Sequence, residues 1–194
     1  MVDCSQRDYA LYVDIMRDLD APRLSFAEYW SKRRIPMNIR ELIRETSNKP
    51  GIDDRFIALR LERCELLEYS IMDKPLPGTY FALWLMSKQF DVHVVSARFN
   101  QVNMLIEIEA LGLRRYLTSI IAAKMQNKVE AFKSLLPDIV AIIGDTEYDI
   151  KAAQELGIPA IAVTTGIRSR EYLESLQPCT VVDTLLDAFG MISP

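Results

Sequence analysis

The chain has 194 residues, which is long enough for one compact domain, or for a core with a small insert, that buries a substantial apolar interior. Its 23 Lys and Arg residues stand against 27 Asp and Glu residues, so the formal net charge of −4 disfavours nucleic acid as a partner. No apolar run is long enough for a membrane span, and the start, Met1-Val2-Asp3-Cys4-Ser5, lacks a basic segment followed by an apolar one. These features predict a soluble protein that is not exported.

Cysteine and glycine usage excludes several common kinds of site. Cys4, Cys64 and Cys179 lie far apart and form no CxxC pair, which argues against a zinc site or a disulfide framework and predicts free thiols in a reducing cytoplasm. The seven glycines form neither GxGxxG nor GxxxxGK[ST]. The motifs that usually identify a dinucleotide-binding site or a P-loop are therefore missing from the sequence.

The first part of the chain, residues 1–75, has helical periodicity. Tyr9, Tyr12 and Met16 belong to one apolar stripe, and Phe56 and Leu59 belong to another. Residues that stop helices fall near positions 21–22, 35–36 and 47–51. We expect a small helical lobe of three or four short helices, with a domain boundary near residues 74–78.

The second part, residues 76–194, alternates helices with short β-branched runs, as a parallel α/β sheet with right-handed crossovers does. The runs are nearly continuous in apolar residues, which is typical of buried parallel strands. On this pattern His93 is predicted to be a core histidine. The expected strands are Val92–Val95, Leu117–Ile121, Ile139–Ile143 and Ala160–Val163, and the expected helices are Thr79–Gln89, Val102–Leu111, Lys128–Leu136, Asp149–Leu156, Glu171–Ser175 and Thr184–Phe189.

Polar residues follow three of the four predicted strands, where ligands bind in open α/β sheets. The strongest signal is Gly144-Asp145-Thr146-Glu147-Tyr148-Asp149. The glycine turn aims Asp145 over the sheet, and Asp149 lies on the same side of the following helix. Two converging carboxylates suit Mg²⁺ with phosphate as a co-ligand. The alternative is that Asp145 only caps the helix and Asp149 is a solvated acid of its first turn.

Two further segments could complete an anion site. Ser96, Ala97 and Arg98 follow the first strand and offer a hydroxyl, backbone N–H groups and a guanidinium. Lys128, at the start of the third helix, could set its ammonium against phosphate, and Lys124 is its nearby rival. Alternatively, Ser96 is a loop residue or helix cap, and either lysine is an ordinary surface residue.

At Val94-Val95-Ser96, Lys128 and Ile142–Asp149, in this order, the chain resembles motifs two, three and four of the haloacid dehalogenase (HAD) superfamily. The downstream stretch Leu156–Gly166 also resembles the one that follows the acidic motif in phosphoglycolate-phosphatase-like and related members. The similarity covers roughly residues 76–189 and implies a Rossmann-like core with a helical cap that closes over the substrate. It also implies a Mg²⁺-dependent phosphatase acting on a small phosphorylated metabolite. In such relatives Ser96 would bind phosphate, Lys128 would balance negative charge, and Asp145 with Asp149 would hold the metal.

The chain departs from this family at motif one, an apolar strand ending in DxDG[TV] that supplies the nucleophile and the general acid. No such segment is present, and Met1–Ser5 resembles the residues that follow it, as though the chain began just past its first strand. Asp18-Leu19-Asp20 is the only DxD, and its surroundings predict a helix terminus. The family places the missing strand between those ending at Val95 and Ile143. We therefore expect an exposed or collapsed gap, which could recruit a second chain into a homo-oligomer, and turnover near zero.

Three hypotheses remain open. The chain is a truncated or impaired HAD-like phosphohydrolase, or a non-catalytic relative that binds phosphate and Mg²⁺ for a regulatory or partner-binding role, or a protein that shares the fold only. Upstream codons for an apolar run and Asp-x-Asp-Gly would support the first. Substrate choice would fall to a basic and aromatic cluster in the lobe, which could equally be a solvated helix end: Tyr29, Trp30, Lys32, Arg33 and Arg34.

Overall fold

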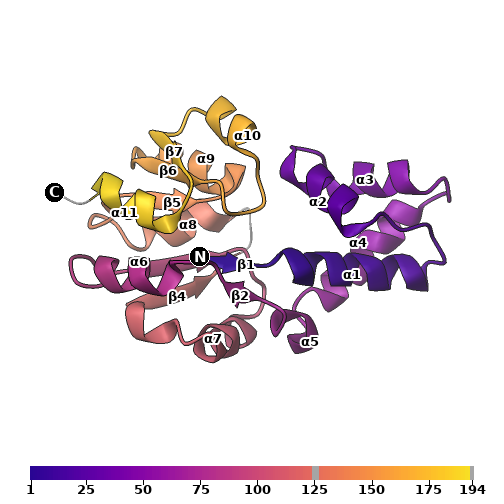
Figure 1. Cartoon of the computed structure of the whole chain (residues 1–194), viewed down its shortest axis with the longest axis horizontal. Helices are drawn as coiled ribbons and strands as arrows, with labels where there is room; N and C mark the ends of the chain where they lie inside the picture. Colours follow the sequence, from indigo (N-terminus) through magenta and orange to yellow (C-terminus); the bar gives the residue numbers. More distant parts are fainter. Residues whose placement is uncertain (124–126, 193–194) are drawn as a thin grey trace. The chain divides into compact units, whose positions relative to one another are not determined.

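The computed structural model describes residues 1–123 and 127–192 and divides into two compact units (Figure 1). One unit is helical and consists of Cys4–Asp73. The other consists of Met1–Asp3 and the chain from Lys74 onward, and it carries the strands. The first three residues therefore belong with the α/β unit, although the sequence pattern grouped them with the helical lobe.

The helical unit is built around one apolar cluster that includes Tyr12, Ile15, Met16 and Phe56, all fully buried. Ser25 and Asn38 begin two of its helices with capping boxes, which fixes where these helices start. Its helices are α1 (Ser5–Asp18), α2 (Phe26–Arg34), α3 (Ile39–Thr46), α4 (Ile52–Arg63) and α5 (Leu67–Ser70).

A buried carboxylate joins three of these helices. Asp8 of α1 accepts from the Tyr29 hydroxyl at 2.8 Å and pairs with Arg33 at 3.0 Å and with Arg60 at 2.5 Å. Burial by itself would raise the pKa of Asp8, but the charges of Arg60 and Arg33 outweigh it and hold that pKa well below its usual value. Tyr29 and Arg33, expected in a surface cluster, are thus engaged inside the unit.

The Asp18-Leu19-Asp20 segment is a helix terminus, as the sequence predicts. α1 ends at Asp18, which pairs with Arg63 at 2.6 Å. Asp20 follows in a left-handed conformation with φ of 49°. The prediction that this DxD ends a helix is confirmed.

The α/β unit contains two parallel sheets and one antiparallel pair, which confirms the predicted fold class. β3 pairs with β4, β5 pairs with β6 and β6 with β7, all in parallel, whereas β1 and β2 are antiparallel. The strands are β1 (Val2–Asp3), β2 (Lys74–Pro75), β3 (His93–Ser96), β4 (Ser119–Ala122), β5 (Ile142–Gly144), β6 (Ala160–Val163) and β7 (Thr180–Val182), and the helices are α6 (Thr79–Met86), α7 (Gln101–Ala110), η1 (Arg114–Tyr116), α8 (Lys128–Lys133), α9 (Glu147–Leu156), α10 (Arg170–Ser175) and α11 (Leu185–Ile192).

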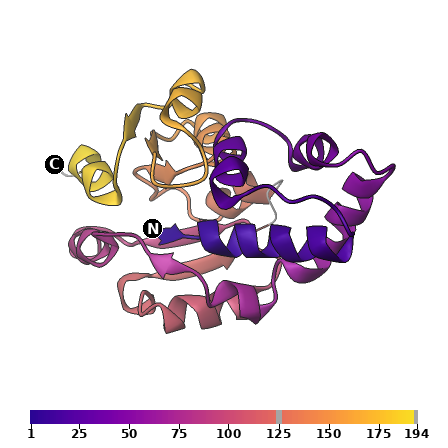
Figure 2. The same cartoon turned by 45° about the vertical axis from the view of Figure 1, so that its right-hand side comes forward.

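Helices cover both faces of these sheets, as Figures 1 and 2 show. On one side, α6, α7 and α11 form an apolar cluster to which Val94 of β3 and Ile143 of β5 contribute. On the other side, α8, α9 and α10 form a second cluster that Val95 and Ile142 join. The β3–β4 and β5–β7 sheets therefore share two apolar layers, while no described strand pairs with both β3 and β5.

Several strand predictions need correction. His93 is exposed, with its Nδ1 2.7 Å from the Ser119 hydroxyl, so the prediction of a core histidine is wrong. β5 begins only at Ile142, and Val140, predicted to lie in that strand, is 54% exposed. Of the strands in the described residues, only β6 has every residue buried. The physical reason is that β3 and β5 each have a strand partner on one side only among the described residues.

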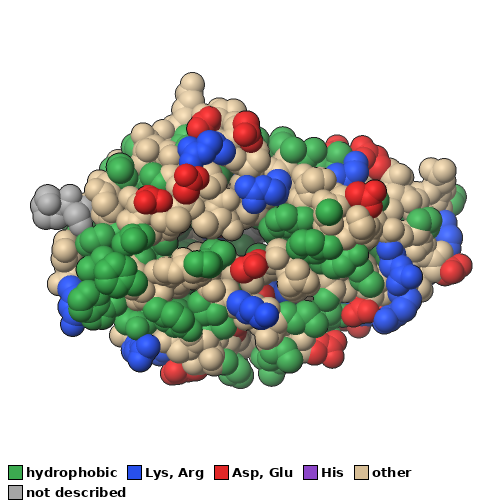
Figure 3. Space-filling model, in the orientation of Figure 1, with side chains coloured by type: hydrophobic (Ala, Val, Ile, Leu, Met, Phe, Trp, Pro, Cys, Tyr) green, Lys and Arg blue, Asp and Glu red, His purple; other side chains and the backbone are tan. Residues whose placement is uncertain are grey.

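The face in Figure 3 carries a gathering of apolar side chains over α6. Tyr80, Phe81 and Trp84 of this helix are each more than two-fifths exposed, and the last two stack at 6.0 Å between ring centroids. Within the described part of the chain, no helix is both long and apolar enough to cross a membrane. Among the described residues, Cys4, Cys64 and Cys179 are not joined in disulfides.

Candidate phosphate and metal site

Asp145 stands directly after β5, at the carboxyl end of the strand, where the sequence pattern placed it. Its Oδ2 accepts from the backbone N–H of Ile167, in the loop after β6, at 2.8 Å. Burial raises the pKa of Asp145, and the neighbouring carboxylate of Asp149 raises it further. The Ile167 N–H, the chain's amino terminus and Lys128 act in the opposite direction.

Two glycines make room for these acids. A Cβ on Gly144 would collide with the side chain of Asp149, and a Cβ on Gly166 would collide with the carboxylate of Asp145. Neither contact could be relieved by moving the far end of a long side chain. The two glycines are thus required by the close approach of Asp149 and Asp145, and Gly166 belongs to the site although the sequence reasoning assigned it no role.

Lys128 and Asp149 form a buried ion pair beside Asp145. The Lys128 ammonium, at the first residue of α8, lies 2.5 Å from Asp149 Oδ1, and both side chains are less than one-tenth exposed. Asp149 Oδ2 accepts from the backbone N–H and the hydroxyl of Thr146, which closes the capping box of α9. Asp149 therefore caps its helix and holds the lysine at the same time.

Arg168 and Glu147 clamp the loop after β6 against the start of α9. The guanidinium donates to both carboxylate oxygens, from Nε at 2.8 Å and from a terminal nitrogen at 2.6 Å. Burial by itself would raise the pKa of Glu147, but hydrogen bonds from Arg168 and the backbone, together with the charges of Arg168 and Lys151, outweigh it and lower that pKa. This pair fixes the loop that carries Gly166 and Ile167, and so helps to position Asp145. The sequence reasoning missed it, although the loop follows the carboxyl end of a parallel strand.

The remaining predicted site residues lie around β3. Ser96 is its last residue, and the Ser96 carbonyl accepts from the N–H groups of Arg98 and Ala123. Arg98 is buried and pairs with Glu107 at 2.7 Å, so its charge is balanced within the unit. Ala97 lies between them, whereas Lys124, the rival to Lys128, falls outside the described residues. The phosphate-binding roles of Ser96, Ala97 and Arg98 stay predictions.

The acids fit one magnesium ion better than a protein-only metal cage. Within residues 1–123 and 127–192 no group of three or more His, Cys, Asp and Glu side chains could hold a metal. Mg²⁺ needs only one or two carboxylates when waters and phosphate oxygens complete its shell. Burial, and after it the charge of Asp149, raises the pKa of Asp145, and a bound cation would favour the ionised form of this carboxyl group. Because both oxygens of Asp149 already have partners, Asp145 is the better placed ligand.

Comparison with known proteins gives consistent matches. The HAD-hydrolase-like family model matches residues 114–188. "Probable phosphatase IndB" of Dickeya dadantii (strain 3937) is 25% identical over 205 residues, covering 98% of this chain and 88% of that protein. "Pyrophosphatase PpaX" of Bacillus mycoides (strain KBAB4) is 32% identical over 57 residues, which is 29% of this chain and 26% of that protein.

Solved structures agree on the fold. A haloacid dehalogenase-like hydrolase from Streptococcus pneumoniae superposes with a TM-score of 0.76 at 16% identity, covering 100% of this chain and 93% of that one. A predicted phosphatase from Clostridium acetobutylicum gives a TM-score of 0.73 at 18% identity, covering 99% and 93%. These solved structures share the fold of this chain, whose residues 114–188 match the HAD-hydrolase-like family model.

Proposed function

We propose that this chain is a HAD-like phosphohydrolase that binds Mg²⁺ and a small phosphate ester beside Asp145, with turnover impaired by the absence of an Asp-x-Asp-Gly segment. The observation that carries the proposal is the buried Lys128–Asp149 pair next to Asp145 at the end of β5. Relatives named as phosphatases support the reaction class. A soluble, cytoplasmic protein working on a phosphorylated metabolite is the setting that we propose.

Each residue has a distinct part in this proposal. Asp145 would hold Mg²⁺, which when bound would polarise a phosphoryl oxygen and offset its charge. Lys128 would present its ammonium to the phosphate while Asp149 fixes its direction. The Ser96 hydroxyl would donate to another phosphate oxygen. Positioning and charge balance are what phosphoryl transfer asks of a protein, but a phosphoenzyme route also needs a nucleophile, and the sequence contains no Asp-x-Asp-Gly.

The test is hydrolysis of p-nitrophenyl phosphate by the 194-residue chain with Mg²⁺, beside an Asp145→Ala variant. We expect no turnover above background in either protein, together with Mg²⁺-dependent retention of inorganic phosphate by the unaltered chain alone. If the unaltered chain hydrolyses the ester and Asp145→Ala does not, another carboxylate serves as the nucleophile. The proposal that turnover is impaired would then be wrong. Equal phosphate retention by both proteins would refute the site.

A non-catalytic relative is the second candidate, and the missing Asp-x-Asp-Gly favours it as much as it favours an impaired enzyme. Such a protein would use the same phosphate and Mg²⁺ pocket for regulation or for contact with a partner, including a second copy of itself. It predicts ligand binding without turnover even when upstream codons are translated. If the reading frame upstream encodes an apolar run ending in Asp-x-Asp-Gly, and the longer chain hydrolyses the ester, this candidate is eliminated.

A further inference from the structure

Every exposed side chain of α6 is aromatic. Tyr80, Phe81 and Trp84 are 44%, 54% and 45% exposed, and Figure 3 shows the apolar side chains gathered over this helix. The rings of Phe81 and Trp84 stack at 6.0 Å between centroids, and the ammonium of Lys88, just beyond the helix, lies 5.9 Å from the centroid of the Trp84 ring. These four side chains make up what we call the aromatic face.

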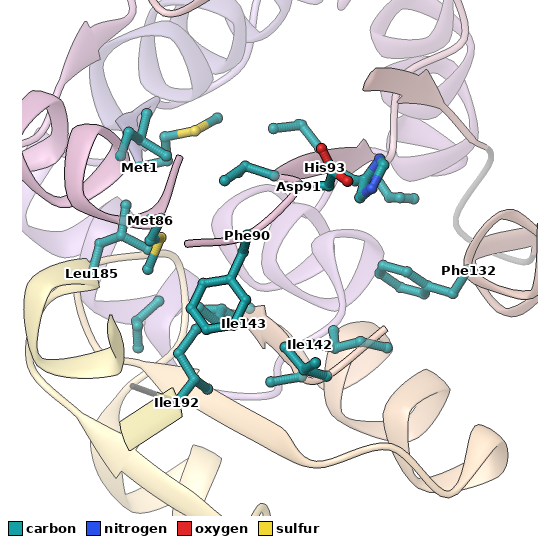
Figure 4. A pocket seen from close by; sticks show the side chains of 18 of the residues that line it. Met1, Met86, Phe90, Asp91, His93, Phe132, Ile142, Ile143, Leu185 and Ile192 are labelled. Atoms are coloured by element: carbon teal, nitrogen blue, oxygen red, sulfur yellow. The ribbon is translucent and has the colours of Figure 1, made fainter. Parts of the chain in front are cut away.

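The other side of α6 packs into the core. Leu83 and Met86 are buried there against Leu185 and Phe189 of α11. In Figure 4, Met86 and Leu185 lie on the same wall of the groove of about 250 Å³ between β3 and β5. The helix is therefore apolar on both sides, and its eight residues include no charged side chain. A helix that is apolar all round is ordinarily covered on all sides.

Another helix of the same unit shows the usual arrangement. α9 buries Ile150 and Ala153, while its exposed side carries Lys151, Gln154 and Glu155. The exposed rings of α6 therefore do not reflect a general shortage of polar residues in this unit. Tryptophan and tyrosine are enriched among the residues that dominate the binding energy of protein–protein interfaces, because burying a large ring removes much apolar surface from water. The aromatic face is best explained as a contact surface.

Charge favours a second copy of this chain as the partner. The net charge of the chain is −4, so an anionic membrane or a strongly acidic protein would be repelled. Two copies repel each other where their acidic surfaces meet, but the aromatic face contains no carboxylate, and Lys88 is its only charged member. Two copies can therefore approach through this face without bringing like charges together at its centre.

We infer that two copies of the chain associate through their aromatic faces, with the two α6 helices antiparallel across a two-fold axis. The rings of one copy then stack on those of the other at the centre of the interface. Lys88 follows the carboxyl end of α6, so it reaches the first turn of the other helix, where the rings of Tyr80 and Phe81 accept a cation–π contact. The inference is independent of the proposed phosphatase reaction, because none of these residues belongs to the phosphate and metal site.

The exposed area suits a weak dimer. Three rings that are about half exposed present on the order of 200–350 Å² per chain, and about twice that in a pair. Specific interfaces bury roughly 1,200–2,000 Å² in total, so the rings supply about a third to a half of the smallest such interface and the residues around them supply the rest. We expect a dissociation constant on the order of 10 μM.

Sedimentation velocity of the 194-residue chain at about 1 to 200 μM tests the inference. The weight-average mass should rise from 22.2 kDa toward twice that value as the concentration increases. Phe81→Glu places a carboxylate within the aromatic face and should weaken the dimer at least about tenfold. Val102→Glu is the matched control, because Val102 is 63% exposed on α7, and it should leave dimerisation unchanged. A chain that stays monomeric throughout, or a dimer that the two substitutions affect equally, would overturn the inference.

Trp84 gives a second measurement that does not require Phe81→Glu to fold. The chain has two tryptophans, Trp30 and Trp84, so the fluorescence of a Trp30→Phe variant reports on Trp84 alone. Its emission maximum should shift to shorter wavelength as the mass doubles, because the dimer removes the ring from water. A doubling of mass with unchanged Trp84 emission would place the contact elsewhere, for example along β3 or β5, and would overturn the inference.

Discussion

At Gly166 the close approach of the backbone to Asp145 can be tested directly. An added methyl group in Gly166→Ala meets the Asp145 carboxylate, so the loop or the acid must shift and the Ile167 hydrogen bond is weakened. We expect a loss of about 1–3 kcal/mol in the free energy of unfolding, measured by urea denaturation. Mg²⁺-dependent phosphate binding should weaken as well.

Gly190→Ala is the matched control for that substitution. Gly190 lies in α11, and a Cβ there meets nothing within 4 Å. Replacing a helical glycine by alanine should stabilise the protein by about 0.5–1 kcal/mol. If both substitutions change stability equally, the steric account of Gly166 fails.

The Lys128–Asp149 pair calls for a double-mutant cycle because each partner is buried with the other. Lys128→Met leaves a buried carboxylate, Asp149→Asn leaves a buried ammonium, and the double variant leaves neither charge. We expect both single variants to be destabilised and the double variant to recover a coupling energy of about 0.5–3 kcal/mol. Additive losses in urea denaturation would show that the pair is not coupled.

Sequence reasoning reached the acids of the site through local spacing. Asp145 and Asp149 follow a glycine after an apolar run, and this pattern is visible within six residues. The clamp between Glu147 and Arg168 joins residues 21 positions apart and depends on how the loop after β6 folds back. Nothing in the local sequence around Arg168 distinguishes an arginine that pairs with Glu147 from an ordinary surface arginine. The pair can therefore be identified only from the structure.

The buried Asp8 carboxylate joins helices of the first unit, so the stability of this unit should fall at acidic pH. Because the folded-state pKa of Asp8 lies below its unfolded value of 3.8, its ionised form contributes stability above that value, which is lost as pH falls toward the folded-state pKa. Asp8→Asn leaves Arg60 and Arg33 without their carboxylate and should cost about 3–5 kcal/mol at neutral pH. Urea denaturation followed by the circular dichroism of the helices, at pH 7 and below pH 4, measures both the cost of Asp8→Asn and the loss of stability in acid.

Asp20→Asn serves as the control for Asp8→Asn. The Asp20 side chain is fully exposed, and asparagine tolerates the left-handed backbone found there. We expect little change in stability and an unaltered acid response. A similar loss in both variants would mean that generic charge removal, and not the buried network, is being measured.

Elements were predictable where their burial is complete. β6 has the predicted bounds and four buried residues, since it lies between β5 and β7. β5 and β3 are shifted by up to three residues because, in the part of the chain that the structure describes, each has a strand on one side only. β7 is three residues long and gave no periodic signal, and β1 and β2 form only through pairing between positions more than 70 residues apart. Tertiary contacts, not local pattern, set these elements.

On the scale of the whole molecule, the α/β unit holds its phosphate-site residues and its strand gap close together. Asp145 lines the groove between β3 and β5 while also belonging to the charged cluster with Lys128 and Asp149. The sequence predicted this neighbourhood through the order of its motifs, and the family match supports the fold. Metal and phosphate binding at this place is the claim on which the functional account depends.

Calorimetric titration of inorganic phosphate into the 194-residue chain, with and without Mg²⁺, tests that claim most directly when the Asp145→Asn variant is titrated beside it. The account predicts binding that needs Mg²⁺, that is lost in Asp145→Asn, and that persists in Asp20→Asn. Phosphate binding that is unchanged without Mg²⁺ or in Asp145→Asn, or that is absent from the unaltered chain, would contradict it.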